Sequence, residues 1–231
     1  MSLLVLALAA SFALSPFFVT SFQGIDPKLY PVPQVDPPVQ PAGWAFAIWG
    51  LLYLWLIVMA GFGVLRRAGD ADWQATRPPL ALSLSLGTFW LAAAERSPVL
   101  ATAMIWLMLL AAVLALLRAP QLRDRWWLGM PLGLYASWLT AASCAGLGLL
   151  GAGWGIGPGE IAWAYVGIAL ATAIGGAVLV ARPQSWGYGA ALIWALAAIA
   201  AKNAETALPV AGAAGLAALA VLTLLLLRGR R

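Results

Sequence analysis

The sequence predicts an all-α membrane protein with about eight membrane-spanning helices. Hydrophobic residues make up 63% of its 231 residues and charged residues only 9%, a composition that would make a soluble domain aggregate. Polar or proline-containing breaks recur about every 20 to 30 residues, a spacing that suits helices crossing a bilayer. The alternation of polar and apolar residues that a transmembrane barrel requires is absent. The chain is therefore expected to fold as a helical bundle in lipid.

Eight apolar segments are predicted to span the membrane. They are residues 3–21, 43–65, 79–94, 98–117, 127–150, 161–181, 186–201 and 207–227. The third and seventh are close to the lower limit of about 17 residues for crossing the hydrocarbon layer. The first has an alternative interpretation as a cleaved signal peptide, although it lacks a basic start and its apolar run continues past Pro16.

The segment 22–42 is the longest stretch outside the predicted spans. It contains six prolines, so it is not expected to be helical and is predicted to form a stiff cover over the outer end of the bundle. Residues 202–205, at the outer end of the seventh span, are interpreted as a solvated turn rather than a gate.

The basic residues predict the orientation of the chain, because Lys and Arg concentrate in cytoplasmic loops. A cytoplasmic N-terminus leaves three basic residues outside, Lys28, Arg96 and Lys202, and places the other ten inside. Those ten are Arg66, Arg67, Arg77, Arg118, Arg123, Arg125, Arg182, Arg228, Arg230 and Arg231. The protein is thus expected in the cytoplasmic membrane with both termini cytoplasmic. The net charge of +5 then reflects orientation and contact with anionic headgroups, and nucleic acid is not an expected partner.

Small residues recur at four-residue spacing on two predicted spans. Gly167, Ala171 and Gly175 form one stripe, and Ala142 and Gly146 form another. Such stripes let helix backbones approach closely in lipid. They are consistent either with a homodimer or with docking of helices within the chain.

Aromatic residues gather at the start of the second span. Residues 41–53 read PAGWAFAIWGLLY, in which Pro41 and Gly43 precede the helix and Phe46, Trp49 and Tyr53 share one of its faces. This motif resembles the opening of the second helix in the TspO/MBR family, the tryptophan-rich sensory proteins related to the mitochondrial translocator protein.

Two further blocks are similar to the same family. Residues 84–90, followed by 96–98, resemble its third helix and the turn into the fourth, and residues 131–142 resemble its fifth helix. The resemblance implies a five-helix bundle over residues 1–150, followed by a three-helix membrane extension over 151–231. Gly87 departs from the family pattern, since an asparagine is usual there, and no asparagine follows Trp138 in the fifth helix.

The resemblance also implies a ligand site. Seven aromatic residues are candidates to line it: Trp44, Phe46, Trp49, Tyr53, Trp90, Tyr135 and Trp138. A site lined by aromatic side chains suits a flat, apolar ligand. Tetrapyrroles such as protoporphyrin are a known ligand class of the family. The propionates of a porphyrin would need cations, for which Lys28 and Arg96 are the outer candidates.

Core packing is the alternative role for the aromatic residues inside the spans. For those near span ends, such as Trp44, the alternative is anchoring at the membrane–water interface. No cofactor is expected to be obligatory and no metal site is predicted. Without histidine in the chain, haem cannot be ligated through His, so the expected ligand is a metal-free porphyrin or a weakly held haem.

Three classes of function agree with these features. The first is a membrane-embedded sensor or binding protein with a regulatory role. The second is a facilitator of transport for porphyrin or another apolar molecule, and the third is a structural or assembly subunit of a membrane complex. An enzyme is not expected, because catalytic pairs and phosphate-binding motifs are missing from the sequence. The expected partners are the lipid bilayer, an apolar small molecule and either a second copy of the chain or another membrane protein.

Overall fold

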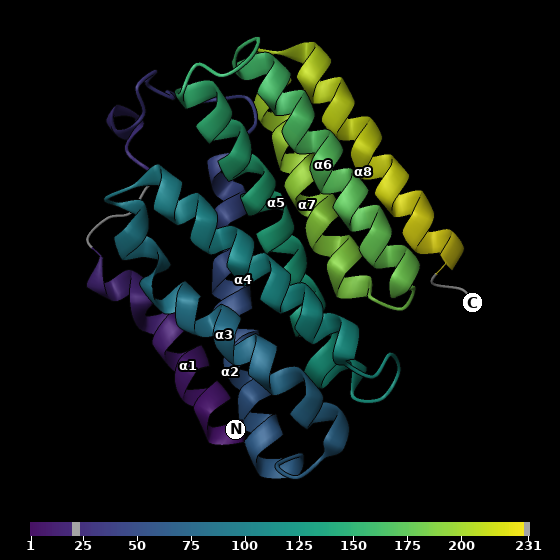
Figure 1. The fold of residues 1–231 in the computed structure, drawn as a ribbon. Coiled ribbons are helices and arrows are strands. Elements are labelled where there is room, and N and C mark those ends of the chain that lie inside the picture. The colour runs from purple at the N-terminus through teal and green to yellow at the C-terminus, as the bar shows by residue number, and fades with distance from the viewer. Residues whose placement is uncertain (20–23, 229–231) are drawn as a thin grey trace.

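The computed structural model describes residues 1–19 and 24–228, and this part of the chain folds into eight α-helices (Figure 1). Their bounds are α1 Ser2–Leu14, α2 Ile48–Arg66, α3 Ala71–Ala94, α4 Pro98–Arg118, α5 Met130–Gly153, α6 Glu160–Ala181, α7 Trp186–Asn203 and α8 Leu208–Arg228. The all-α prediction is confirmed. Ser21, the end of the first predicted span, and Arg230 and Arg231 lie outside the described residues.

Five of the helical stretches are long and apolar enough to cross a membrane. They are Gly43–Arg66, Pro98–Arg118, Arg125–Gly153, Glu160–Ala181 and Leu208–Arg228, which include a 3₁₀ turn before α2 and a π-helical turn before α5. Ser2–Phe18 is apolar but shorter, and α3 and α7 are not among the five. The chain is therefore a polytopic helical membrane protein, with its third and seventh spans the least apolar candidates.

The first α-helix ends sooner than the sequence predicts. It stops at Leu14 and continues as a 3₁₀ turn, Ser15–Phe18. Pro16 has no N–H to give to the carbonyl four residues earlier, which is that of Phe12. The Ser15 hydroxyl donates to this carbonyl instead, at 2.8 Å. A continuous helix to residue 21 was therefore a wrong prediction.

The third helix begins earlier than predicted, at Ala71 rather than at residue 79. Asp70 caps its start by accepting hydrogen bonds from the backbone N–H groups of Asp72 and Trp73. Pro78 and Pro79 lie inside the helix, where each removes one hydrogen bond to a carbonyl four residues before it. Those carbonyls belong to the exposed residues 74 and 75, so the helix continues through both prolines.

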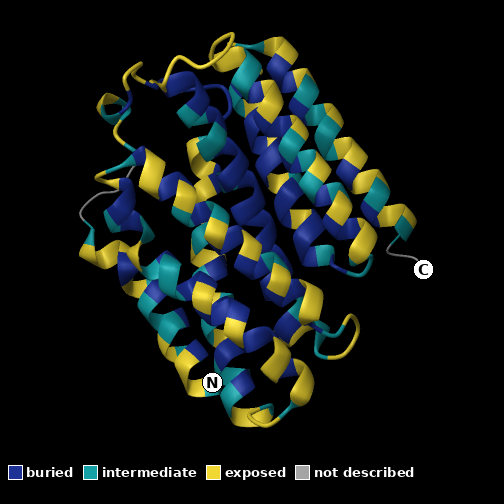
Figure 2. Ribbon diagram, in the orientation of Figure 1, coloured by how far each residue is buried: buried dark blue, intermediate teal, exposed yellow. Residues whose placement is uncertain are grey.

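The first five helices form a closed ring. Helix α1 packs against α2 and α3, α3 packs against α4, α4 against α5, and α5 against α2. Helices α6 and α7 pack on α5, and α8 packs on α6 and α7, so these three helices form a layer beside the ring (Figure 1). Helix α5 is shared by both groups, and residues 131–141 on it are all buried (Figure 2). The predicted division at residue 150 stays a prediction.

The proline-rich segment, residues 24–42, lies across the ends of α5, α6 and α7, and we name it the cover segment. The Tyr30 side chain packs where Gly153 has no side chain, and the Val32 N–H donates to the Gly153 carbonyl at 2.8 Å. Val39 packs against both Gly148 and Gly167. The prediction that this segment covers the end of the bundle is confirmed for these residues, and its stiffness stays a prediction.

The cover segment is also held by α7. Lys202 Nζ lies 2.8 Å from the Asp36 carboxylate and donates to the Pro37 carbonyl at 2.9 Å. Asn203, only 1% exposed, donates to the Pro38 carbonyl at 2.9 Å. The interpretation of 202–205 as a solvated turn was therefore wrong for its first two residues, because both contact a segment about 165 residues away in the chain.

Candidate functional site

Five of the seven predicted site residues lie close together where α2 meets α5, and of these Phe46 is 40% exposed. Trp49 stacks on Tyr53 with ring centroids 5.4 Å apart and meets Trp138 edge to face at 6.2 Å. Phe46 approaches the same Trp138 ring at 5.7 Å. Tyr135 lies one turn before Trp138 on α5, and both side chains are buried. Helical spacing on α2 and α5 thus directs these rings toward one another.

Phe12 of α1 joins this group, although the sequence did not single it out. Its ring meets Trp49 at 5.7 Å, Tyr53 at 5.1 Å and Tyr135 at 6.0 Å, in each case edge to face. Nothing in the periodicity of the first span distinguishes Phe12 from its apolar neighbours. Only the packing of α1 between α2 and α3 identifies it. We name the set Phe12, Phe46, Trp49, Tyr53, Tyr135 and Trp138 the aromatic cluster.

The polar atoms of the cluster differ in how they are paired. The Tyr135 hydroxyl lies 2.9 Å from the Ser83 hydroxyl, which donates to the Met108 carbonyl at 2.8 Å, so α5, α3 and α4 are linked. The indole N–H of Trp138 is buried and has no hydrogen-bond partner among the described residues. Buried donors are nearly always paired, which makes this N–H a candidate contact for a ligand.

Trp44 and Trp90 make their described contacts elsewhere. Trp44 is 53% exposed and meets the Trp194 ring of α7 edge to face at 4.9 Å. The Trp194 indole donates to the Ala45 carbonyl at 3.0 Å, so this pair joins the start of α2 to α7. The Trp90 indole donates to the Ala101 carbonyl on α4 at 2.9 Å. A ligand role for Trp44 and Trp90 stays a prediction.

The two predicted anion contacts are both exposed. Lys28 lies in the cover segment, and its backbone N–H donates to the Asp26 carboxylate at 2.9 Å. Arg96 follows the end of α3 and donates to the Ala92 carbonyl of that helix at 2.8 Å. Their role toward a ligand also stays a prediction.

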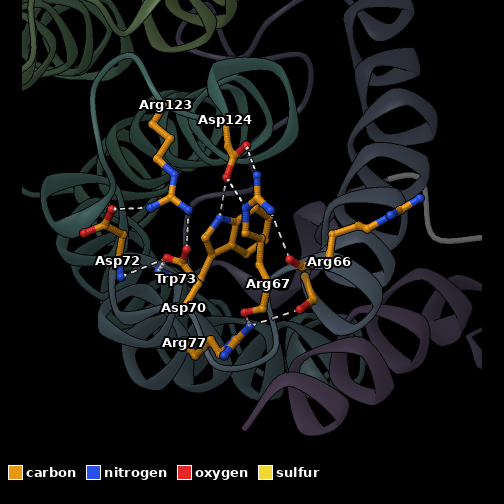
Figure 3. A network of polar contacts seen from close by, with 9 residues as sticks. Arg66, Arg67, Asp70, Asp72, Trp73, Arg77, Arg123 and Asp124 are labelled. Carbon is orange, nitrogen blue, oxygen red and sulfur yellow. Dashed lines mark hydrogen bonds and ion pairs between the residues drawn. The ribbon is translucent and has the colours of Figure 1, made fainter.

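At the opposite end of the ring, a charged network joins the α2–α3 loop to the loop before α5 (Figure 3). Arg67 binds Asp124 through two hydrogen bonds of 2.8 and 3.0 Å, and the Trp73 indole donates to the same carboxylate at 3.0 Å. Arg123 pairs with Asp70 and Asp72. The hydrogen bond from Arg67 holds the pKa of Asp124 below its ordinary value, although burial opposes this effect.

Arg77 is buried beneath this network. It donates to the carbonyls of Gly63, Arg67 and Ala68, and thereby satisfies the C-terminal end of α2. A cavity of about 10 Å³ adjoins it, lined by Val5 and Leu128 among others. Since that volume holds about one water molecule, it is not a site for a tetrapyrrole.

The fold and the cluster define a class: a helical membrane protein whose first five helices pack around a cluster of aromatic side chains. The family model described as TSPO-like protein matches residues 3–227. The chain therefore belongs to the TSPO-like family, and the match runs through all eight helices rather than only the first five. No curated protein and no solved structure matches the chain.

Proposed function

We propose that this protein binds a flat, apolar ligand of the tetrapyrrole class within the aromatic cluster and acts as a membrane sensor. Membership of the TSPO-like family supports a membrane protein of the sensor or binding type. The observation that carries the proposal is the convergence of aromatic rings from α1, α2 and α5 around the buried, unpaired indole N–H of Trp138.

The chemistry of the cluster suits such a ligand. Edge-to-face and offset contacts between aromatic rings contribute about 0.5 to 1.5 kcal/mol each beyond burial of area, and a planar macrocycle can make several of them. The Trp138 N–H can donate to one acceptor on the ligand, which removes the cost of leaving this donor unpaired in an apolar interior. No step of catalysis is included in this role.

The sensor role requires that ligand occupancy alter the helices around the cluster. Phe46 and Trp49 stand at the start of α2, and Trp44 beside them contacts Trp194 of α7. If a ligand shifts the Trp138 ring, the Phe46 ring that contacts it moves as well. This movement would reach the Trp44–Trp194 contact, which joins the start of α2 to α7. A ligand can change this equilibrium only as far as its affinity differs between the two arrangements.

Titration with protoporphyrin tests the proposal. The purified protein in lipid nanodiscs is expected to lose tryptophan fluorescence as protoporphyrin is added. The loss should saturate at one ligand per protein chain. Replacing both Trp49 and Trp138 with Phe is expected to weaken the affinity about tenfold or more, since the Trp138 donor is lost and two indole contact surfaces shrink to phenyl rings. A matched variant, Trp126→Phe, changes an indole that is 58% exposed at the opposite end and should bind like the native protein. Equal affinity in both variants would place the ligand elsewhere.

A further inference from the structure

The ring of Phe12 fills a space that Gly87 leaves open. A Cβ atom at residue 87 would lie 2.7 Å from the Phe12 ring and 3.1 Å from the terminal methyl of Met108, so no side chain fits there while Phe12 is in place. Phe12 itself is only 3% exposed. The ring therefore occupies the interior of the five-helix ring, between α3 on one side and Trp49 and Tyr53 of α2 on the other.

The backbone that carries Phe12 differs from that of the other cluster residues. Phe12 lies in the last turn of the 13-residue helix α1, two residues before its end. The carbonyl of Phe12 accepts from both the backbone N–H and the hydroxyl of Ser15, because Pro16 has no N–H to donate to it. Helix ends fray, whereas Tyr53, Tyr135 and Trp138 stand more than one turn inside longer helices. Compared with these three rings, that of Phe12 is carried by backbone nearer to a helix end.

We infer that the Phe12 ring occupies the ligand position in the unliganded protein and that a flat aromatic ligand takes its place. This inference rests on the proposed function, which it deepens by naming the group that the ligand displaces. The ring contacts Trp49, Tyr53 and Tyr135 by their edges and faces, and an incoming aromatic ring can make the same contacts.

Removal of the ring is the test, with Phe12→Ala compared to Phe18→Ala. Phe18 follows on the same segment but is 83% exposed, so it serves as the matched control. Protoporphyrin affinity is expected to rise about tenfold or more in Phe12→Ala, because the closed arrangement no longer competes with the ligand. Benzene is the second probe, since apolar cavities of one ring in size bind it. It is expected to raise the melting temperature of Phe12→Ala but not that of Phe18→Ala or the native protein.

The two probes separate this inference from the proposed function. If protoporphyrin binds none of the proteins, the tetrapyrrole proposal fails whatever benzene does, because any buried ring replaced with Ala can leave a cavity that binds benzene. If protoporphyrin binds the native protein as tightly as it binds Phe12→Ala, the proposed function stands and the inference about Phe12 is overturned. If neither probe distinguishes Phe12→Ala from Phe18→Ala, Phe12 is an ordinary core residue and the inference is overturned. Should Phe12→Ala fail to fold, Gly87→Ala displaces the ring by its Cβ without opening a hole and is expected to raise protoporphyrin affinity. An unchanged affinity in Gly87→Ala overturns the inference as well.

Discussion

Asn203, at the end of α7, donates a hydrogen bond of 2.9 Å to the carbonyl of Pro38, although 165 residues separate the two in the chain. Pro38 is buried in the cover segment, and the same Asn203 amide also donates to the Ile199 carbonyl of its own helix. The last three helices thus have a structural role that the first five alone cannot supply. They hold the segment between α1 and α2 against the end of the bundle.

Replacing Asn203 with Leu is expected to loosen the cover segment. The Pro38 carbonyl would lose its partner in a buried position, at a cost of about 1 to 3 kcal/mol. Hydrogen exchange of the backbone N–H groups in residues 30–42 should become faster, while exchange in α3 and α4 stays as it is. Glu205→Gln, an exposed change beside the same helix end, is the control. Unchanged exchange in Asn203→Leu would show that the Lys202 and glycine contacts hold the segment without Asn203.

Gly167→Ala is expected to destabilise the protein by about 1 to 3 kcal/mol, because its Cβ would lie 2.8 Å from Val39 of the cover segment and 3.3 Å from the Cys144 carbonyl. Combining it with Val39→Ala should recover part of the loss, since the nearer of the two contacts is then relieved. Gly212→Ala on α8 provides the control, as its Cβ would meet nothing within 4 Å. Thermal unfolding of the native protein, Gly167→Ala, Val39→Ala, the double variant and the Gly212→Ala control measures the effect. Additive losses would show that Val39 and Gly167 do not share this space.

The ion pair between Arg67 and Asp124 is expected to make the folded protein less stable as the pH falls into the acidic range. The pKa of Asp124 is lowered in the folded protein, first by the hydrogen bond from Arg67, so its contribution is present above the ordinary aspartate pKa of about 4. That contribution disappears as the pH falls from about 5 through the lowered value, because the unfolded chain then binds the proton more readily. Asp124→Asn should lower the melting temperature at pH 7 by about 2 to 4 °C and flatten its decline in acid.

A parallel decline in the native protein and in Asp124→Asn between pH 5 and pH 3 would assign the acid sensitivity to other carboxylates. Asp70, which pairs with Arg123 in the same network, is the next group to replace. Glu205→Gln, at the opposite end of the bundle, should follow the native curve.

The orientation of the chain is testable with reporter fusions. Eight helices place the start of α1 and the end of α8 at the same end of the bundle (Figure 1). The distribution of basic residues predicts that this end faces the cytoplasm. A fusion at Arg228 should therefore report a cytoplasmic location, and one within the cover segment at Pro33 an external one. The opposite pair of results would invert the orientation. Results on one side only would mean an even number of crossings between residues 33 and 228 instead of seven.

The helices and most of the aromatic cluster were predictable from the sequence for a definite reason. Phe46, Trp49 and Tyr53 share one helical face, and their proximity to Tyr135 and Trp138 requires only that α2 and α5 be neighbours. The sequence rule that proline ends or begins a helix gave the wrong start for α3. The helix begins at Ala71, well before Pro78 and Pro79, because Asp70 caps it through hydrogen bonds to backbone N–H groups.

Other features depend on contacts that no local pattern contains. The place of Phe12 is set by the absence of a side chain at Gly87, about 75 residues later, and the roles of Lys202 and Asn203 by a proline-rich segment near the other end of the chain. In the sequence, Phe12 looks like any other apolar residue of its span, and Lys202 and Asn203 look like part of an ordinary polar turn. Only the packing of distant segments gives them partners.

The direction of the hydrogen bond between Tyr135 and Ser83 leads to a further prediction. Ser83 has a single hydroxyl hydrogen and gives it to the Met108 carbonyl, so the Tyr135 hydroxyl must be the donor to Ser83. Tyr135→Phe then leaves only an acceptor site on Ser83 unfilled, at a cost of about 1 kcal/mol. Ser83→Ala leaves the buried Tyr135 O–H without an acceptor and should cost more, about 1 to 3 kcal/mol.

The same order should hold for Thr140 and Tyr188, which form a second pair of buried hydroxyls, between α5 and α7. Thr140 donates to the Ala136 carbonyl at 2.9 Å, so Tyr188, 2.6 Å away, is the donor to Thr140. Tyr188→Phe is therefore expected to be milder than Thr140→Val, a replacement of similar shape that strands the tyrosine donor. Free energies of unfolding for the four variants decide the matter. The assignment would be contradicted if the tyrosine variant lost more stability than its serine or threonine counterpart in both pairs. The tyrosine O–H groups would then donate to other acceptors in the folded protein.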